Sequence, residues 1–220
     1  MSSPVIIIGN GGHASVVCSA LRASGRKVLA ATDVVSGRQG RMPSDIRVIS
    51  DEQLLDEYRS EDVELALGVG SIWPNTSTSP WQRITNRFES CGFRFVTIIH
   101  PFAWVSPDSK IGKGCQLHAG AIVQPGVTLG EFTVLNTRAS IDHDCNIGAY
   151  CHLSPGATLS GDVTLGDGCH LGTGCSVVQG IELGQGCFVA AGATVVTSHP
   201  DHQYLKGTPA RSFSPSIQRT

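Results

Sequence analysis

Residues 141–171 read IDHDCNIGAYCHLSPGATLSGDVTLGDGCHL, and every sixth residue of this stretch is isoleucine or leucine. The same period runs from Val105 to Val195, and all sixteen of its positions hold Val, Ile or Leu. A period of six matches neither the 3.6-residue repeat of an α-helix nor the two-residue repeat of a strand. It fits a short strand followed by a tight turn, with three such units completing one triangular coil.

The positions around each aliphatic residue support this interpretation. From 105 to 195 there are fifteen hexapeptides and hence five coils, in which each aliphatic side chain points inward and stacks on the residue eighteen positions away. Glycine is frequent one and three residues after the aliphatic, where the chain must pack closely or turn with positive φ. Two residues before it the side chain is usually small, as at Ala121, Ala139, Ala157, Ala193, Cys115, Cys145, Cys151, Cys169, Cys175 and Cys187.

The cysteines and the charge balance limit the possible functions. Six of the eight cysteines lie on the six-residue lattice, so we expect them to be reduced and buried as small hydrophobic residues. The sequence has no CxxC pair, which argues against a zinc site, and we expect no metal. With 15% charged residues and a net charge of −2, the chain lacks the basic face that nucleic-acid binding needs. No run of about 20 apolar residues occurs. We therefore expect a cytoplasmic protein with no membrane or nucleic-acid partner.

The first hundred residues have a different pattern, in which strands and helices alternate. Such alternation indicates a small parallel sheet. The sequence thus predicts a Rossmann-like domain over residues 1–100 and a β-helix with a C-terminal tail over residues 101–220. The expected elements of the first domain are strands at 5–8, 26–33, 63–67 and 94–99, helices at 51–59 and 81–91, and a loop at 72–80. A further helical stretch follows the glycine-rich turn at 9–14 and ends near Gly25.

A glycine-rich turn follows the first predicted strand. Gly9 and Gly11 precede a helix that begins before Ala14, so backbone N–H groups and the helix N-terminus could meet an anion. Asp33 lies about twenty residues further on, where a carboxylate would contact a ribose. A segment of this length suits one nucleotide diphosphate better than a dinucleotide. A tight turn without any ligand is the alternative.

One group of residues in the repeat can do chemistry. His143 lies between Asp142 and Asp144, and a carboxylate beside one ring nitrogen makes the other a better proton acceptor. Gly161 stacks eighteen residues on, where its amide could face an oxyanion. His152 follows nine residues after His143, on another face, where His170 stacks on it. This separation favours sites shared between protomers and hence a homotrimer. The alternative for each histidine is a solvated surface residue.

Taken together, these features resemble the NeuD/PglD-type sugar O- and N-acetyltransferases, which carry hexapeptide repeats. The resemblance extends over residues 4–211. Its most specific motifs are Gly9-Asn10-Gly11-Gly12-His13, Asn136-Thr137, His143-Asp144-Cys145-Asn146-Ile147-Gly148, His152 and Gly207-Thr208-Pro209-Ala210-Arg211. The last of these is similar to the segment of hexapeptide acyltransferases that contacts the coenzyme region.

The resemblance implies a left-handed parallel β-helix and assigns residue roles. His143 would be the general base, and Asp144, where many members carry Glu, would raise its basicity. A loop at 72–80 that is longer than usual would affect which nucleotide or sugar fits. The nucleotide-sugar pocket would be lined by Gly11, Gly12, His13, Asp33 and Gly68, and acetyl-CoA would lie near His152, Gly161, Thr173 and Ala191.

We therefore expect N-acetylation, by acetyl-CoA, of a nucleotide-linked amino sugar. A 4-amino-4,6-dideoxy sugar such as GDP-perosamine or a UDP-4-amino sugar would attack directly, without an acyl-enzyme. The alternatives are O-acetylation of a sialic acid and, in another class, a structural β-helix without catalysis. A β-helical carbonic anhydrase would need two histidines five residues apart, which the sequence lacks. A sugar nucleotidyltransferase would need a much larger catalytic domain.

Overall fold

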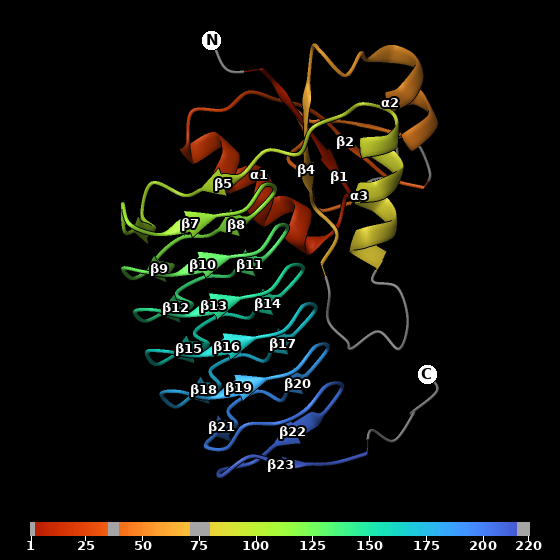
Figure 1. Cartoon of the computed structure of the whole chain (residues 1–220). Coiled ribbons are helices and arrows are strands. Elements are labelled where there is room, and N and C mark those ends of the chain that lie inside the picture. The colour runs from red at the N-terminus through yellow and green to blue at the C-terminus, as the bar shows by residue number, and fades with distance from the viewer. Residues whose placement is uncertain (1–2, 35–39, 71–79, 215–220) are drawn as a thin grey trace. The chain divides into compact units, whose positions relative to one another are not determined.

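The computed structural model describes residues 3–34, 40–70 and 80–214, which form two compact units (Figure 1). One unit extends to Pro101 and the other begins at Phe102. Among the described residues, no helix is long and apolar enough to cross a membrane. The loop predicted at 72–80 lies outside the described residues except for Pro80, which begins a helix.

The first unit contains a parallel sheet with the strand order β3-β2-β1-β4. Its central strand β1 (Val5–Ile8) consists of four buried aliphatic residues, as expected for a strand covered on both faces. The helix α1 (Gly12–Ala23) follows it and buries Ala14, Val17 and Leu21. The remaining elements are β2 (Val28–Thr32), β3 (Arg47–Ile49), α2 (Asp51–Glu57), β4 (Glu64–Leu67), α3 (Pro80–Ser90) and β5 (Ile98–Ile99).

Two elements of this unit differ from the sequence prediction. The edge strand β3 was not expected, because its three residues are too few to show a period. The predicted strand 94–99 is shorter, since the segment makes only two hydrogen bonds to Leu65 of β4, through Arg94 O and Val96 N. Phe95 and Val96 are consecutive and both buried, so the segment does not alternate between the two faces of a sheet. Only Ile98 and Ile99 form a strand, β5.

The second unit is a parallel β-helix of two-residue strands (Figure 1). Its strands form three sheets, which we name after one member each. The β12 sheet contains β6 (Trp104–Val105), β9 (Ile122–Val123), β12 (Ser140–Ile141), β15 (Thr158–Leu159), β18 (Ser176–Val177) and β21 (Thr194–Val195). The β13 sheet contains β7 (Lys110–Ile111), β10 (Thr128–Leu129), β13 (Asn146–Ile147), β16 (Thr164–Leu165) and β19 (Glu182–Leu183). The β14 sheet contains β8 (Gln116–Leu117), β11 (Val134–Leu135), β14 (His152–Leu153), β17 (His170–Leu171), β20 (Phe188–Val189), β22 (Tyr204–Lys206) and β23 (Arg211–Ser212).

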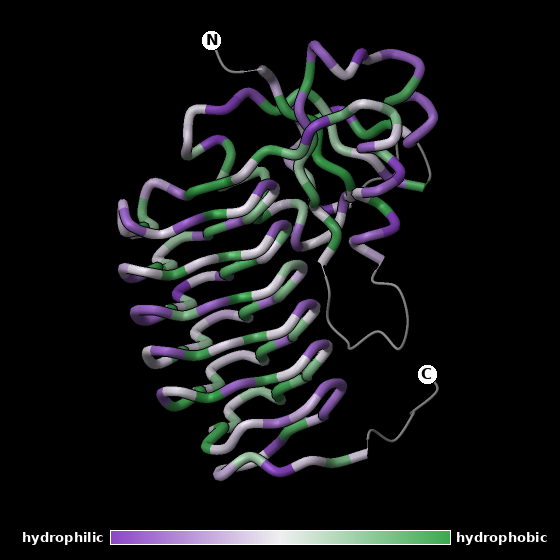
Figure 2. The backbone as a smooth tube through the Cα atoms, in the orientation of Figure 1, coloured by the Kyte–Doolittle hydropathy of each residue, from purple (hydrophilic) through white to green (hydrophobic). Residues whose placement is uncertain are grey.

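Neighbouring strands pair in the register of eighteen that the sequence predicted. Ile141 pairs with Leu159, and Leu153 pairs with Leu171. Every aliphatic repeat position from Leu117 to Val195 is at most 2% exposed, so the stacked side chains fill the inside of the coils. Along each coil, apolar residues alternate with hydrophilic stretches at the turns (Figure 2). This burial supplies the main stabilisation of the unit.

The turns between the sheets form three corners. Corner I leads from the β12 sheet to the β13 sheet, corner II from there to the β14 sheet, and corner III back to the β12 sheet. Every sixth residue from Gly114 to Gly192 has positive φ, and nine of these positions are glycine. The other five are Phe132, Arg138, Asp144, Tyr150 and Asp162.

The lattice cysteines are buried as predicted, and five of the six also donate a hydrogen bond to a carbonyl oxygen. The thiol of Cys151 lies 3.2 Å from the carbonyl oxygen of Gly166 in the next coil. Thr133, at the equivalent position one coil earlier, donates to Gly148 O at 2.8 Å. Burial raises the pKa of Cys115 to about 11 and that of Cys175 to about 12. The buried thiols therefore remain protonated, and those that donate satisfy carbonyl groups of the turns.

The repeat changes register after Val195, where the sequence pattern ended. Leu183 pairs with His199 and Phe188 with Tyr204, so the register falls from eighteen to sixteen. The corner I turn of this coil is therefore two residues shorter than the others. The chain then forms β22 and returns antiparallel as β23.

Candidate active site

The five residues predicted to line a nucleotide pocket lie at one edge of the parallel sheet. Gly11 is the N-cap of α1, Gly12 and His13 form its first turn, and Asp33 and Gly68 directly follow β2 and β4. The chain leaves β1 toward β2 on one side, whereas β4 pairs with β1 on the other side. The carboxyl end of β1 is therefore the switch point of the sheet, where open α/β sheets bind ligands.

Close packing holds these residues together. Gly68 donates its amide to Ile8 O at 2.8 Å, and a Cβ at Gly68 would lie 2.5 Å from the Ile7 side chain. Asp33 accepts a hydrogen bond from the Asn10 amide at 3.4 Å, which ties the end of β2 to the glycine-rich turn. The local fold thus places a carboxylate beside the N-terminus of α1, as expected for contacts with a ribose and a phosphate.

The predicted catalytic residues lie in the corner I turn between β12 and β13. Asp142 Oδ1 accepts a hydrogen bond from the His143 backbone amide at 2.7 Å, which shapes the turn. The Nδ1 atom of His143 lies 2.9 Å from Asp144 Oδ2. An aspartate therefore reaches the imidazole in spite of its short side chain. The carboxylate favours the tautomer that carries a proton on Nδ1, which leaves Nε2 as a proton acceptor.

The surroundings of His143 raise its pKa above the ordinary value. The hydrogen bond that the imidazole donates to Asp144 is the largest cause of the raised pKa. Desolvation, the second-largest effect, opposes it, and the charges of Asp142, Asp144 and Asp162 raise the pKa further. The imidazole side chain is 53% exposed, so substrates can reach it. A more basic imidazole is the better proton acceptor, provided that the pH keeps it neutral.

Glycines in the neighbouring coils make room for this pair. A Cβ at Gly161 would lie 2.6 Å from Nε2 of His143, so the ring lies directly against Gly161, as the stacking by eighteen predicted. A Cβ at Gly126, one coil on the other side, would lie 2.4 Å from Asp144 Oδ1. Gly126 was missed from the sequence, although counting eighteen residues back from Asp144 would have found it.

A second missed residue is Asp162, eighteen positions after Asp144. Its backbone amide donates to His143 O at 2.9 Å, and it has the same left-handed conformation as Asp144, with φ of 61°. Corner I therefore carries aspartates in two successive coils at a position that is glycine at 126 and 180.

The predicted coenzyme residues do not gather around His143 in one chain. Gly161 lies beneath the imidazole, but Thr173 and Ala191 are exposed in corner III, one coil apart. His152 lies in the β14 sheet with its ring centroid 5.0 Å from that of His170. Burial lowers the pKa of His170 to about 4, which keeps it neutral. A single chain thus divides the predicted coenzyme residues between different corners and faces.

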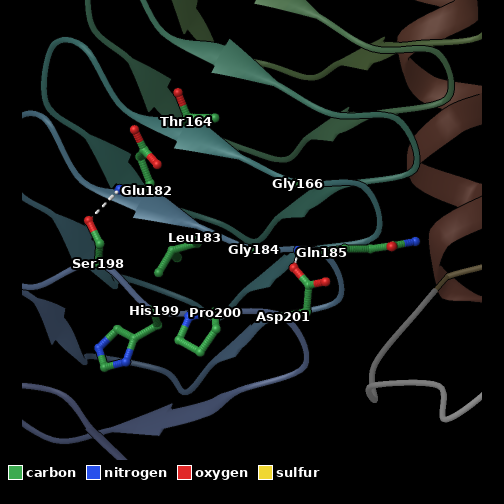
Figure 3. Close-up of a pocket in the computed structure, with 10 residues that line it drawn as sticks. All are labelled: Thr164, Gly166, Glu182, Leu183, Gly184, Gln185, Ser198, His199, Pro200 and Asp201. Atoms are coloured by element: carbon green, nitrogen blue, oxygen red, sulfur yellow. Dashed lines mark hydrogen bonds between the residues drawn. The ribbon is translucent and has the colours of Figure 1, made fainter.

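A groove lies on the β13 sheet near the end of the β-helix, where the coil is shortened (Figure 3). None of the predicted site residues lines it. In the close-up, Ser198 accepts a hydrogen bond from the Glu182 amide and Asp201 accepts one from the Gln185 amide. These polar groups stabilise the shortened turn. The groove is lined by Thr164, Gly166, Glu182, Leu183, Gly184, Gln185, Ser198, His199, Pro200 and Asp201.

Metal-binding residues are not clustered in the part of the chain that the structure describes. There, no group of three His, Cys, Asp or Glu residues is arranged to hold a metal ion.

Comparisons with known proteins match both units. Residues 4–74 match the family model of the PglD N-terminal domain, and residues 162–197 match the model "hexapeptide repeat of succinyl-transferase". Perosamine N-acetyltransferase from Caulobacter crescentus, solved with CoA and GDP-perosamine as a variant with one histidine replaced by asparagine, is 34% identical. The alignment covers 98% of this chain and 99% of that one, with a TM-score of 0.87. The chain belongs to the NeuD/PglD-type sugar acetyltransferases. These are hexapeptide-repeat enzymes that use acetyl-CoA, and their β-helix is left-handed.

A second structure leads to the same NeuD/PglD-type family. The acetyltransferase domain of PglB from Neisseria gonorrhoeae, solved in complex with acetyl coenzyme A, is 33% identical over 97% of this chain and 100% of that one, with a TM-score of 0.87. WeeI from Acinetobacter baumannii, at 20% identity and a TM-score of 0.79, shows the same fold. A comparison with curated protein sequences gives no match.

Proposed function

We propose that this enzyme transfers the acetyl group of acetyl-CoA to the amino group of a nucleotide-linked amino sugar. The observation that carries the proposal is the His143–Asp144 pair, in which Nδ1 is bonded to the carboxylate and Nε2 lies against Gly161. The two relatives described above at 33% and 34% identity are acetyltransferases in name, and one was solved with GDP-perosamine. A 4-amino-4,6-dideoxy sugar linked to GDP or UDP is accordingly the proposed substrate.

The reaction requires one proton acceptor and one oxyanion donor. The neutral amine attacks the thioester carbonyl carbon, a C–N bond forms, and the carbonyl oxygen becomes an oxyanion. His143 Nε2 accepts the proton that leaves the nitrogen. The tetrahedral intermediate then collapses, the C–S bond breaks, and the CoA thiolate takes up a proton. The products are the N-acetylated sugar and CoA. General-base assistance of this kind contributes about 10²–10⁴ in rate.

The oxyanion donor proposed here is the Gly161 backbone amide. Within the described part of the chain, no acceptor is hydrogen-bonded to this N–H, although Gly161 is buried beneath the His143 ring. A buried amide without an acceptor is costly, and a developing oxyanion would satisfy it. The proposed acceptor for the proton and the proposed donor to the oxyanion are therefore neighbours in two successive coils.

Direct transfer is preferred over an acyl-enzyme. The lattice cysteines are buried, and burial raises the pKa of the Cys145 thiol, the one nearest to His143 in sequence. A protonated, buried thiol is a poor nucleophile. The free thiols also fit a reducing compartment, and we propose a cytoplasmic location.

The divided coenzyme site favours a homotrimer. If corner I of one protomer faced corner III of the next around a threefold axis, Thr173 and Ala191 of one chain would join His143 and Gly161 of its neighbour. Size-exclusion chromatography with light scattering would measure the mass at working concentration. Full activity in a monomeric enzyme would contradict the shared site.

The experiment that tests the function is a substrate panel. UDP- and GDP-linked 4-amino-6-deoxy sugars are incubated with acetyl-CoA, and CoA release is followed together with the mass of the sugar product. We expect a gain of one acetyl group on an amine. A sialic acid is tested in parallel, and acetylation of its hydroxyl with no reaction on any amine would favour O-acetylation instead. If no acceptor caused release of CoA, the result would contradict both functions.

A further inference from the structure

Corner I concentrates negative charge around one histidine. Asp142, Asp144 and Asp162 all act on the His143 imidazole, and their charges favour its protonated form. Asp142 and Asp144 contact His143 through its amide and its ring, and Asp162 donates its own amide to His143 O. Within the described residues, no lysine or arginine forms an ion pair with any of the three carboxylates.

Turn geometry alone does not require a side chain at position 162, because glycine occupies the equivalent places at 126 and 180. Gly126 and Gly180 have φ of 76° and 70°, close to the 61° of Asp162. Glycine adopts this conformation without a steric cost, whereas a side chain with a Cβ is strained there. Asp144 has the same strain and contacts the imidazole. Phe132 and Tyr150 adopt the same conformation in a packed corner, so it is the contact of Asp144 with the imidazole, and not the strain, that marks corner I as a reactive site.

Resting on the proposed function, we propose that Asp162 selects the protonated amino sugar as the acceptor substrate. Its exposed carboxylate, one coil beyond Asp144, would attract the ammonium form of the sugar to corner I. The bound ammonium then releases one proton to solvent at this exposed corner, and the neutral amine attacks. The same negative field stabilises the positive charge that the nitrogen acquires as the C–N bond forms, before His143 accepts the second proton. A hydroxyl acceptor carries no such charge and gains nothing from the carboxylate.

The same charges also orient the two substrates. CoA and the nucleotide diphosphate are both anionic, so their phosphates are repelled by corner I and must lie away from it. Only the thioester and the amino end of the sugar can then approach His143. Asp162 thus distinguishes amines from hydroxyls and also opposes the reversed binding of either substrate.

The test compares an amine with a hydroxyl in otherwise identical ligands. Calorimetry measures the Kd of the amino nucleotide sugar and of its analogue with a hydroxyl at the same carbon, at neutral pH and low salt. We expect the wild type to prefer the amine. Asp162→Asn and Asp162→Gly should each weaken amine binding about two- to fivefold, as expected for one partly screened charge, and leave hydroxyl binding unchanged. High salt should reduce the difference between wild type and variant.

Controls separate this role from a structural one. Asp162→Gly reproduces the residue of the neighbouring coils, so its thermal unfolding should match or exceed that of the wild type. Asp56→Asn removes an exposed carboxylate from the other unit and should leave both Kd values unchanged. An equal loss for amine and hydroxyl, or no change in either, would overturn the role of Asp162 while acetyl transfer by the wild type continued. Failure of the wild type to acetylate any amino nucleotide sugar would instead overturn the proposed function.

Discussion

Corners I and II of the β-helix have the same backbone conformation but carry different side chains. Both place non-glycine residues at the left-handed turn position in two successive coils. At corner II these are Phe132 and Tyr150, which are buried and stacked with ring centroids 5.1 Å apart. At corner I they are Asp144 and Asp162, which are exposed beside His143. The repeat therefore determines the positions of the side chains. Their chemical nature determines whether a corner contributes to the packed core or to the proposed active site.

The largest effect should come from removing the base at corner I. His143→Ala should lower kcat/KM by about 10²–10⁴-fold while both substrates still bind, because the imidazole acts mainly in the transition state. The loss should be greater at low pH, where little free amine is available to attack unaided. Steady-state kinetics across the pH range would measure it. Near-normal activity at every pH would show that corner I contributes by positioning alone.

Removing an aromatic side chain at corner II should instead affect stability. Phe132 is 1% exposed, so Phe132→Ala should lower the free energy of unfolding by about 3–5 kcal/mol, and activity per folded molecule should persist. Phe132→Gly should be about 1 kcal/mol less destabilising than Phe132→Ala, since glycine is unstrained at positive φ. Urea unfolding at one fixed protein concentration would compare them. If a Phe132 variant stayed stable but lost activity, corner II would not differ from corner I in the role proposed here.

A milder change at corner I concerns the basicity of His143. Asp144→Asn should reduce kcat/KM less than His143→Ala does. The carboxylate raises the pKa of the imidazole, so its loss lowers that pKa and moves the acid limb of the pH–rate profile to lower pH. The kcat profile of wild type and variant would show the shift. An acid limb that stayed in place would mean that another group titrates there.

The smallest effect is expected when the folded protein is treated with a thiol reagent, because the lattice cysteines should not react. Cys91 is exposed and should react rapidly with a small thiol reagent, and Cys91→Ser should abolish this phase. The six lattice thiols are buried and should react only after denaturation, since the thiolate is the reactive form. Mass spectrometry of labelled peptides would assign each site. Rapid labelling of Cys115, Cys145 or Cys169 would contradict the burial of the lattice thiols.

The repeat made much of the β-helix predictable from sequence. The aliphatic period predicted the coils and their number, and the register of eighteen predicted that Gly161 would lie against His143. The Asp142-His143-Asp144 block was conspicuous because the repeat usually places small or neutral residues there. Position alone could not give the left-handed aspartates a role, because phenylalanine, arginine and tyrosine residues adopt the same conformation at other positions of the repeat.

Other features escaped prediction for a different physical reason. The thiol hydrogen bonds, such as Cys151 to Gly166 O, join residues fifteen apart, and a buried cysteine looks the same in sequence whether or not it donates. The strand β3 is too short to show alternation, and β5 is what remains of a longer apolar segment that serves packing. In the first unit no period repeats, so each element has to be inferred from its own few residues.

The shortened coil after Val195 has a consequence for self-association. Every coil presents the next one with the same ladder of backbone donors and acceptors, and an open end of this kind could pair with another molecule. The register of sixteen, the antiparallel return of β23, and the hydrogen bonds that Thr194 makes with Gly207 and Ala210 replace that ladder with one no further coil can match. The irregular ending therefore opposes end-to-end stacking of one β-helix on another.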